Sequence, residues 1–231
     1  MVVIKIGGEI LEFPQEFAKF AELLKNGSPA AVVFGAGVQI NRRLKETGIP
    51  FQFYKGERIT TMQMLEIIND EFRKIAGRIK DLLEPAEVQF IDGSAIFACR
   101  KKSPELGFVG EIVSVTAEVV KKYLKEGKIV LVSPIGKDGD ENLCNVNADV
   151  SASALAVALS ADSLIYFTKV KGVLDESNNL IRNLNGEKVA ELMEKNIVSE
   201  GMIPKVNSAI SALKNGVGRV LIGETAVESG Y

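Results

Sequence analysis

Runs of apolar, β-branched residues alternate with segments of helical spacing along the whole chain. Strands that run into glycine are expected at residues 2–8, 30–37, 88–93, 128–136, 163–172 and 218–223. Apolar residues three and four positions apart predict helices at residues 14–25, 61–83, 116–125, 149–160, 187–195 and 203–214. This alternation is typical of βαβ units, so we expect an α/β fold, a three-layer α/β/α sandwich around a mostly parallel open sheet.

The middle of the chain departs from this alternation. Residues 94–114 alternate apolar and polar positions around a Ser-Pro turn, which predicts an antiparallel hairpin inserted near the ligand-binding edge of the sheet. The chain divides most easily near Ser160–Asp162, between a helix of small residues and a new strand. We therefore expect an N-terminal lobe of residues 1–160 and a C-terminal lobe of residues 161–231.

Composition excludes several classes of function. The 28 Lys and Arg residues nearly balance the 30 Asp and Glu residues, giving a net charge of −2. Without a basic excess, we expect neither nucleic acid nor an anionic membrane as a partner. The absence of histidine excludes an imidazole base and any zinc site built on histidine ligands, and we expect no protein-held metal.

The two cysteines, Cys99 and Cys144, do not form a CxxC pair. Such isolated thiols fit a reducing cytoplasm, where free cysteine behaves as a small apolar residue. The sequence contains no apolar run of 18 residues, and it begins directly in a strand pattern without the basic and apolar regions of a signal peptide. We expect an intracellular, cytoplasmic, soluble protein.

Two glycine-rich turns follow the first two strands. Gly7-Gly8 and Gly35-Ala36-Gly37 place backbone N–H groups at the carboxyl ends of strands, where open α/β sheets bind ligands. Neither turn matches a Walker A loop or GxGxxG. Glycine is also common in βα loops for conformational reasons alone, so either turn could be purely structural.

Two lysines stand at positions that could serve an anion. Lys5 lies within the apolar first strand, and a lysine there needs an anionic partner because lysine is rarely buried alone. Lys205 precedes an apolar helix and could point from its start toward the same crevice, although a solvated surface lysine is the simpler interpretation.

The segment NVNAD (145–149) is the densest polar cluster and precedes an uncharged helix. One of its polar side chains is expected to cap that helix. Asp149 could then hold both lysines as their shared counter-ion. Arg58, close behind Gly56, offers a planar fork for a substrate carboxylate, or else is an ordinary surface arginine.

Taken together, these segments resemble the amino acid kinase family, and within it the N-acetylglutamate kinases. The resemblance covers nearly the whole chain. It rests on KIGG (5–8), FGAGVQI (34–40), GERITT (56–61), GFVGEI (107–112), NVNAD (145–149), KGVLD (171–175) and EGMIPKV (200–206), in the order and spacing of the family. NVNAD together with GMIPK is its most specific part.

The resemblance implies a role for each candidate residue. Lys5 and Lys205 would neutralise the transferring phosphoryl group, and Asp149 would organise both lysines. The substrate would be bound by Gly35, Ala36, Arg58 and Asn145. Phosphate and ATP would be bound by Gly7, Gly8, Gly37, Thr168, Lys169 and Gly172. The glycines would act through their backbone N–H groups, and Mg²⁺ would be carried largely by ATP oxygens.

The implied activity is ATP-dependent phosphorylation of the γ-carboxylate of N-acetyl-L-glutamate, a step of arginine biosynthesis. The first lobe would bind substrate and dimerise through the helix at 61–83, and the second would bind the nucleotide. Because the first strand begins at Val2, we expect a homodimer without arginine feedback. Two alternatives stay open: another kinase of the family, acting on an aminoadipate derivative or a nucleoside monophosphate, and a non-catalytic regulator that binds nucleotide or amino acid.

The chain departs from the family pattern at four positions. Phe34 replaces the usual histidine, Ala36 replaces a glycine, Lys169 replaces an aspartate, and Val38 replaces a proline. Backbone donors survive the first two changes, because alanine and phenylalanine keep their N–H groups. The third bears on nucleotide affinity or preference.

Overall fold

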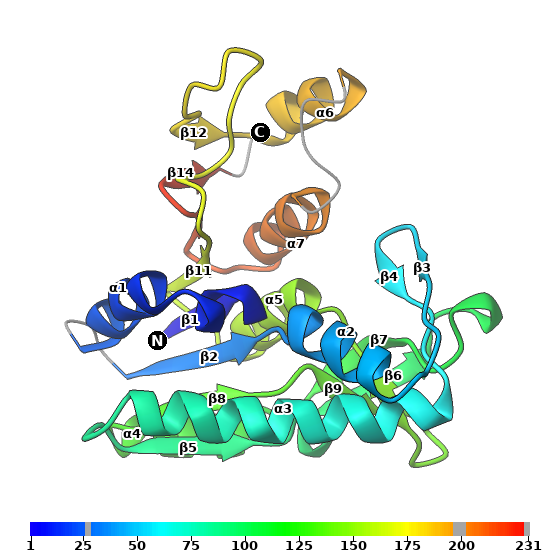
Figure 1. Cartoon of the computed structure of the whole chain (residues 1–231). Helices are drawn as coiled ribbons and strands as arrows, with labels where there is room; N and C mark the ends of the chain where they lie inside the picture. The colour runs from blue at the N-terminus through cyan, green and yellow to red at the C-terminus, as the bar shows by residue number, and fades with distance from the viewer. Residues whose placement is uncertain (26–28, 196–201, 229–231) are drawn as a thin grey trace.

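The computed structural model describes residues 1–25, 29–195 and 202–228 (Figure 1). The strands are β1 (Val2–Ile6), β2 (Ala30–Phe34), β3 (Phe53–Tyr54), β4 (Glu57–Arg58), β5 (Val88–Ile91), β6 (Phe97–Lys101), β7 (Gly110–Val115), β8 (Ile129–Val132), β9 (Ile135–Lys137), β10 (Leu143–Asn145), β11 (Ser163–Phe167), β12 (Asn183–Leu184), β13 (Arg219–Ile222) and β14 (Thr225–Val227). The helices are α1 (Pro14–Lys25), α2 (Gly37–Glu46), α3 (Met62–Leu82), α4 (Glu118–Lys125), α5 (Ala148–Ala158), α6 (Gly186–Glu194) and α7 (Ile203–Lys214), with the short 3-10 helices η1 (Gly8–Glu12), η2 (Gly93–Ala95) and η3 (Pro104–Leu106).

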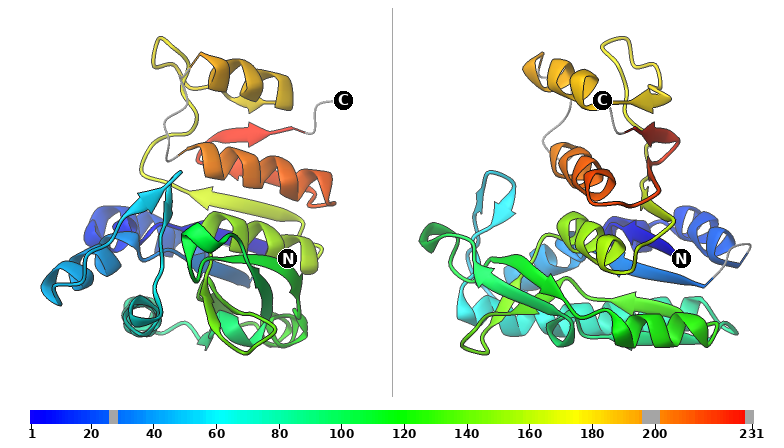
Figure 2. Two further views of the ribbon diagram at one scale, coloured as in Figure 1. Left: turned by 90° about the vertical axis from the view of Figure 1, so that its right-hand side faces the viewer. Right: turned by 180° about the vertical axis from the view of Figure 1, so that it is seen from behind.

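The main sheet confirms the predicted fold class. In the described part of the chain it holds eight strands in the order β12-β14-β13-β11-β1-β2-β8-β5. Neighbouring strands are parallel except β13 and β14. In Figure 1 the sheet runs from β12 at the top to β5 at the bottom, and Figure 2 shows from two further sides that the elements from β11 onward gather at one end.

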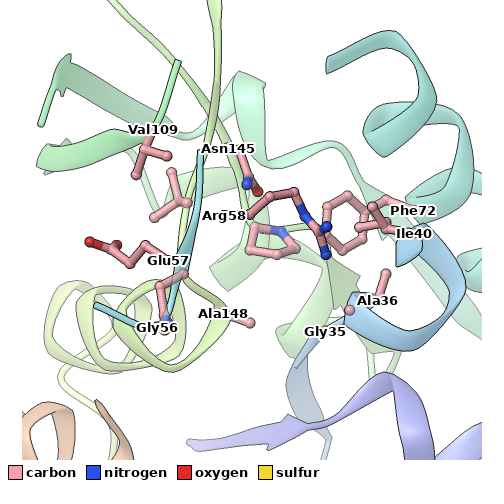
Figure 3. A pocket seen from close by; sticks show the side chains of 14 residues that line it. Gly35, Ala36, Ile40, Gly56, Glu57, Arg58, Phe72, Val109, Asn145 and Ala148 are labelled. Atoms are coloured by element: carbon pink, nitrogen blue, oxygen red, sulfur yellow. The ribbon is translucent and has the colours of Figure 1, made fainter. Parts of the chain in front are cut away.

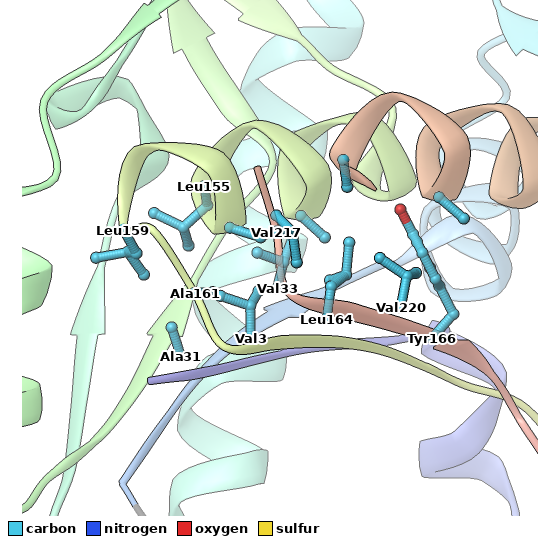
Figure 4. Packing of buried hydrophobic residues seen from close by; sticks show 14 of the residues in the cluster. Val3, Ala31, Val33, Leu155, Leu159, Ala161, Leu164, Tyr166, Val217 and Val220 are labelled. Atoms are coloured by element: carbon cyan, nitrogen blue, oxygen red, sulfur yellow. The ribbon is translucent and has the colours of Figure 1, made fainter. Parts of the chain in front are cut away.

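Helices cover both faces of this sheet, which explains why its strands are apolar at nearly every position. Alternate residues of a strand point to opposite faces. Val3 and Val33 pack in a cluster with α4, α5, α6 and α7, whereas Ile4 and Val32 pack in a second cluster with α1, α2 and α3. Figure 4 shows part of the first cluster, with Leu155 of α5 and the following C-cap residue Leu159 above the sheet. The three layers are therefore α/β/α.

The predicted hairpin at 94–114 is confirmed as the antiparallel pair β6 and β7. It belongs to a second sheet with the order β10-β9-β6-β7. The strand predicted at 128–136 is wrong as a single element, because β8 joins the main sheet and β9 joins the second sheet. Pro134 lies between them and has no N–H to continue a ladder. The sequence did not predict the short β3–β4 hairpin, which pairs Phe53 with Arg58.

Helix α3 confirms the prediction for 61–83, and Thr61 caps it by accepting the Met64 N–H. Its predicted apolar positions face the core of the same chain, since Met64, Leu65, Ile68, Phe72, Ile75 and Ile79 are buried, whereas Met62 and Leu82 at its ends are exposed. Phe34 is fully buried and packs edge-on against Phe72, with ring centroids 5.8 Å apart. Phe34 thus serves the core in place of a polar side chain. Within the described ranges, none of the helices combines the length and the apolarity needed to cross a bilayer.

Candidate active site

Lys5, Asp149 and Lys205 meet at the carboxyl end of β1. Lys5 shares a face of the sheet with Val3, because alternate residues of a strand point the same way, and α5 and α7 cover that face. The Lys5 Nζ lies 2.9 Å from Asp149 Oδ1 on α5. The Lys205 Nζ on α7 lies 3.4 Å from Asp149 Oδ2. The structure therefore brings together three side chains that are far apart in the sequence.

This cluster of charged side chains is mostly buried. The side chains of Lys5, Asp149 and Lys205 are 8%, 7% and 19% exposed. Burial and the nearby Lys5 charge lower the pKa of Lys205, while Asp149 opposes both effects. Asp149 contacts both ammonium groups, and the Glu9 charge also supports the charged form of Lys205. Two ammonium groups at one place are suited to binding an anionic ligand.

The three polar residues of NVNAD have separate tasks. Asn147 is the cap, since its side-chain oxygen accepts the N–H groups of Asp149 at 2.8 Å and Val150 at 3.2 Å. The Asp149 carboxylate is thereby available to the lysines. Asn145 ends β10, and its amide donates to the Thr60 hydroxyl at 3.1 Å.

Arg58 is buried, not a surface arginine. It ends β4, is 7% exposed, and its guanidinium lies 5.0 Å from the centre of the Phe51 ring and 4.8 Å from that of Phe53. Burial lowers its pKa to about 10, so it remains charged at neutral pH. Among the described residues, its buried Nη1 atom has no hydrogen-bond partner. A buried cation with unused donors needs an anion, and its planar fork matches a carboxylate.

A cleft of about 150 Å³ lies between Arg58 and the start of α5. Figure 3 shows the Arg58 guanidinium pointing into it, toward Gly35 and Ala36, while Glu57 points the opposite way. Opposite directions are expected of neighbouring strand residues. The cleft is lined by Gly35, Ala36, Gly37, Ile40, Gly56, Glu57, Arg58, Phe72, Val109, Pro134, Asn145, Val146, Asn147 and Ala148. It therefore includes all four residues predicted to bind substrate.

The two glycine turns are in contact. A methyl group on Gly8 would come within 2.7 Å of the Gly35 carbonyl oxygen, so only glycine fits there. The Glu9 carboxylate packs against Gly7, in the space that a Cβ at this position would occupy. The predicted N–H donation by Gly35 is wrong, because that group donates to the Ile6 carbonyl at 2.8 Å. Gly35 instead leaves room in the cleft.

Gly37 begins α2, whose N-cap residue Ala36 provides no side-chain hydrogen bond. The first N–H groups of a helix lack internal partners and attract anions. In α5 the Asn147 side chain meets this need, whereas the start of α2 faces the cleft without a capping side chain. The start of α2 thus keeps donors for a ligand.

The residues predicted to border a nucleotide lie at the carboxyl end of β11. Thr168 and Lys169 line a second cleft together with residues of α1, and this cleft shares no lining residue with the first. The Lys169 Nζ lies 4.2 Å from the centre of the Phe13 ring. Gly172 packs against the Thr225 side chain, which leaves no space for a Cβ.

Sequence reasoning missed two residues near the cluster. Gln39 donates to the Gly8 carbonyl at 2.8 Å and to Glu12 at 2.9 Å, and so links the two glycine turns. Its place in the FGAGVQI motif was the available signal. Tyr166 lies beneath Asp149, and its hydroxyl donates to the Asp149 carbonyl. The sequence holds no signal for this contact, because an aromatic residue in a buried strand is expected in any core. Among the residues described, no group of three or more His, Cys, Asp or Glu side chains is arranged to hold a metal ion.

Comparison with known proteins decides the family. The sequence model of the amino acid kinase family matches residues 1–224. The chain belongs to the amino acid kinase family. Among its relatives are the acetylglutamate kinase of Pelagibacter ubique, 33% identical over 96% of this chain and 80% of that protein, and the acetylglutamate kinase of Bacillus velezensis, 35% identical over 96% and 88%.

The structure of smu.665 from Streptococcus mutans is similar throughout, with a TM-score of 0.86 and 27% identity over 99% of this chain and 98% of that one. The family thus accounts for the fold along nearly its whole length. Motifs that carried the resemblance contribute residues to the two clefts and to the charged cluster between β1, α5 and α7. Glu200 and Gly201 of EGMIPKV lie outside the described residues.

Proposed function

We propose that this protein is an ATP-dependent kinase that phosphorylates the γ-carboxylate of N-acetyl-L-glutamate, the acetylglutamate kinase reaction of arginine biosynthesis. The relatives named acetylglutamate kinase support this substrate. The observation that carries the proposal is that Lys5 and Lys205 both pair with Asp149 beside a cleft. The guanidinium of Arg58 lines this cleft and has a donor without a hydrogen-bond partner among the described residues.

The reaction requires no general base. A γ-carboxylate is ionised at neutral pH, so one of its oxygens can attack the terminal phosphorus directly. The bond between that phosphorus and the bridging oxygen breaks, its electron pair leaves with ADP, and an acyl phosphate is formed. Transfer of this kind depends on positioning and on stabilising charge. A chain without histidine can supply both.

In this assignment Lys5 and Lys205 neutralise charge that develops on the transferring group. Asp149 holds the two ammonium groups close together despite their mutual repulsion, and it exchanges no proton. Each preorganised donor of this type is worth about 3 kcal/mol in the transition state. Partial burial strengthens the effect because water screens the charges less.

The substrate end of the site is the cleft below the β3–β4 hairpin. Arg58 would hold the α-carboxylate through its fork, and Asn145 would contact the acetamido group. Gly35 and Ala36 would form the floor, where small residues leave room for the acyl chain. The cleft volume of about 150 Å³ is suited to a small acylated amino acid.

The phosphates would lie along Gly7, Gly8 and the start of α2 at Gly37, where backbone donors are available. The rest of the nucleotide would reach the carboxyl end of β11, bordered by Thr168, Lys169 and Gly172. Mg²⁺ would be held mainly by phosphate oxygens, as is common for this ion, and would neutralise part of their charge.

We assign the substrate role to a lobe of residues 1–160 and the nucleotide role to a lobe of residues 161–231. This division agrees with the first cleft, lined only by residues between Gly35 and Ala148. The main sheet continues through both lobes, so they share a core. The free, buried thiols of Cys99 and Cys144 fit a reducing cytoplasm.

We also propose a homodimer, with contact along α3 and the edge strand β5. Edge strands carry unpaired backbone groups that a second copy can satisfy. Gly77 on α3 has open space around it, which permits close approach of another helix. Sedimentation should give a species of about 50 kDa, twice the 25.0 kDa of the chain. A species of 25 kDa at micromolar protein would contradict this.

Hydroxylamine trapping of acyl phosphate tests the proposed reaction. The protein is incubated with Mg-ATP and N-acetylglutamate, glutamate, aspartate or N-acetylaminoadipate, and ADP release is followed in parallel with UMP. Hydroxamate with N-acetylglutamate alone is the expected result. Hydroxamate with another acid, or ADP release with UMP, would move the substrate within the family, and no product from any acceptor would overturn the kinase assignment.

A further inference from the structure

Tyr166 is fully buried beside the charged cluster. It lies on β11 directly opposite Lys5 on β1, and partners of this kind in neighbouring strands point to the same face of a sheet. Figure 4 shows its ring rising from the sheet toward the helices, with the hydroxyl oxygen at the level of the helix layer. The ring thus lies beside Lys5, and both side chains extend from the sheet toward the helices that carry the other two charges.

The Tyr166 hydroxyl contacts α5 and lies close to α7. It donates to the backbone carbonyl of Asp149 in the first turn of α5, at 3.3 Å. The Ser208 side chain on α7 is near enough to the same hydroxyl to lower the pKa of Tyr166, against the larger effect of burial. Ser208 is three residues after Lys205, so the two side chains lie on the same face of α7. One hydroxyl therefore lies beside the elements that carry all three charged residues.

Burial raises the pKa of Tyr166 well above its ordinary value, and the nearby Asp149 charge acts in the same direction. The hydroxyl is therefore protonated at neutral pH and can donate to the Asp149 carbonyl. A neutral donor fits this place, since a phenolate there would repel both the carbonyl and the Asp149 carboxylate.

We propose that Tyr166 is a positioning residue: its hydroxyl joins α5 to α7 and sets the distance between Asp149 and Lys205. This proposal rests on the proposed kinase function only where the effect of Tyr166 is measured as a change in kcat. Tyr166 contacts no substrate. It acts on the reaction through the positions of Asp149 and Lys205.

Ser153 provides a matched control. Its hydroxyl donates to the Ser208 backbone carbonyl at 3.0 Å, so it also joins α5 to α7 through a buried bond. It lies one turn farther along α5 from Asp149 and outside both clefts. Ser153→Ala removes a bond between the same helices without touching Asp149 or Lys205.

The test compares Tyr166→Phe with Ser153→Ala. Tyr166→Phe keeps the ring and its packing, and we expect kcat to fall about tenfold while KM for both substrates changes less than twofold. Ser153→Ala is expected to lose similar thermal stability and to keep kcat. Unchanged kcat in Tyr166→Phe, or an equal loss in Ser153→Ala, would refute the positioning role.

A second readout does not depend on turnover. NMR of ¹³C-labelled lysine, with the Lys205 signal assigned by Lys205→Arg, follows the titration of its ammonium group. Among the described residues, Lys5, Asp149 and Glu9 carry charges that act on that group. If Tyr166→Phe lets Asp149 move away, the pKa of Lys205 falls below the wild-type value, and Ser153→Ala leaves it unchanged. Identical titrations of Lys205 in Tyr166→Phe and wild type would overturn the positioning role, whether or not the wild-type protein is active. Absence of phosphorylation of any acid by the wild-type protein would count against the proposed function alone.

Discussion

The side-chain oxygen of Asn147 accepts the backbone N–H of Asp149 at 2.8 Å, two residues along the same helix start. Asn147 thereby satisfies the end of α5, and the Asp149 carboxylate turns outward to Lys5 and Lys205. If Asp149 itself capped the helix, its oxygens would be directed at backbone donors instead. The spacing of these two residues is what allows a helix start to carry a counter-ion for two lysines.

Removal of the cap should affect both stability and turnover. Asn147→Ala is expected to lower the free energy of unfolding by about 1 kcal/mol, the usual value for a lost cap, and to lower kcat because the first turn of α5 frays. Asn147→Asp keeps an acceptor and should retain most of the stability. Urea unfolding and steady-state kinetics measure the two effects. Full stability in Asn147→Ala would contradict the capping assignment.

Lys205→Ala should lower kcat by about 10²- to 10³-fold with little change in either KM, because its charge is needed most in the transition state. Lys214→Ala is the matched control, since Lys214 is an exposed lysine in the last turn of the same helix. Its kinetics should equal those of the wild type. A Lys205→Ala variant with normal kcat would mean that the phosphoryl group is neutralised elsewhere.

Arg58→Ala should mainly raise KM for N-acetylglutamate, by about 10- to 100-fold, since a hydrogen bond between charged groups is worth about 1.5–3 kcal/mol. KM for ATP should change little. Arg100→Ala serves as control, because Arg100 is an exposed arginine paired with Glu111. Equal KM values in Arg58→Ala and wild type would remove Arg58 from the substrate site.

The pH dependence of turnover follows from Lys205. Its pKa lies below the ordinary value of 10.5, and the charged form is the active one. Turnover is therefore lost as pH rises through this lowered pKa. At saturating N-acetylglutamate, kcat should decline as pH rises, with the midpoint of the decline below pH 10.5. Asp149→Asn should shift this midpoint to lower pH, because the carboxylate supports the charged form of Lys205.

Lys205→Arg separates this effect from other titrations, since an arginine in its place stays charged to higher pH. An active variant of this kind should lose the alkaline decline in kcat. The titration of Arg58, with a pKa of about 10, should still appear in kcat/KM, because it concerns binding of the acid. An identical alkaline decline in kcat in Lys205→Arg would assign it to another group.

The sequence by itself determined the class of the fold and most of the order of its elements, although helix α2 and the β3–β4 hairpin were not predicted. Strands that are apolar at nearly every position and run into glycine indicate a sheet covered on both faces, and helical spacing predicts the covering helices. It also marked the chemistry, since a lysine in an apolar strand and three polar residues before an uncharged helix are costly unless they have partners.

Only the tertiary structure decided which partner each side chain received. Local spacing cannot show that Asn147 is the cap and Asp149 the counter-ion, because both residues favour helix starts. It cannot show that the Gly35 N–H bonds to Ile6 on the neighbouring strand, since that contact is nonlocal. The burial of Arg58 against two aromatic rings depends on the β3–β4 hairpin. Each of its strands has two residues, which is too short to produce a periodic pattern in the sequence. Tyr166 gains its position beneath Asp149 from the strand order, which places β11 next to β1 although some 160 residues separate them.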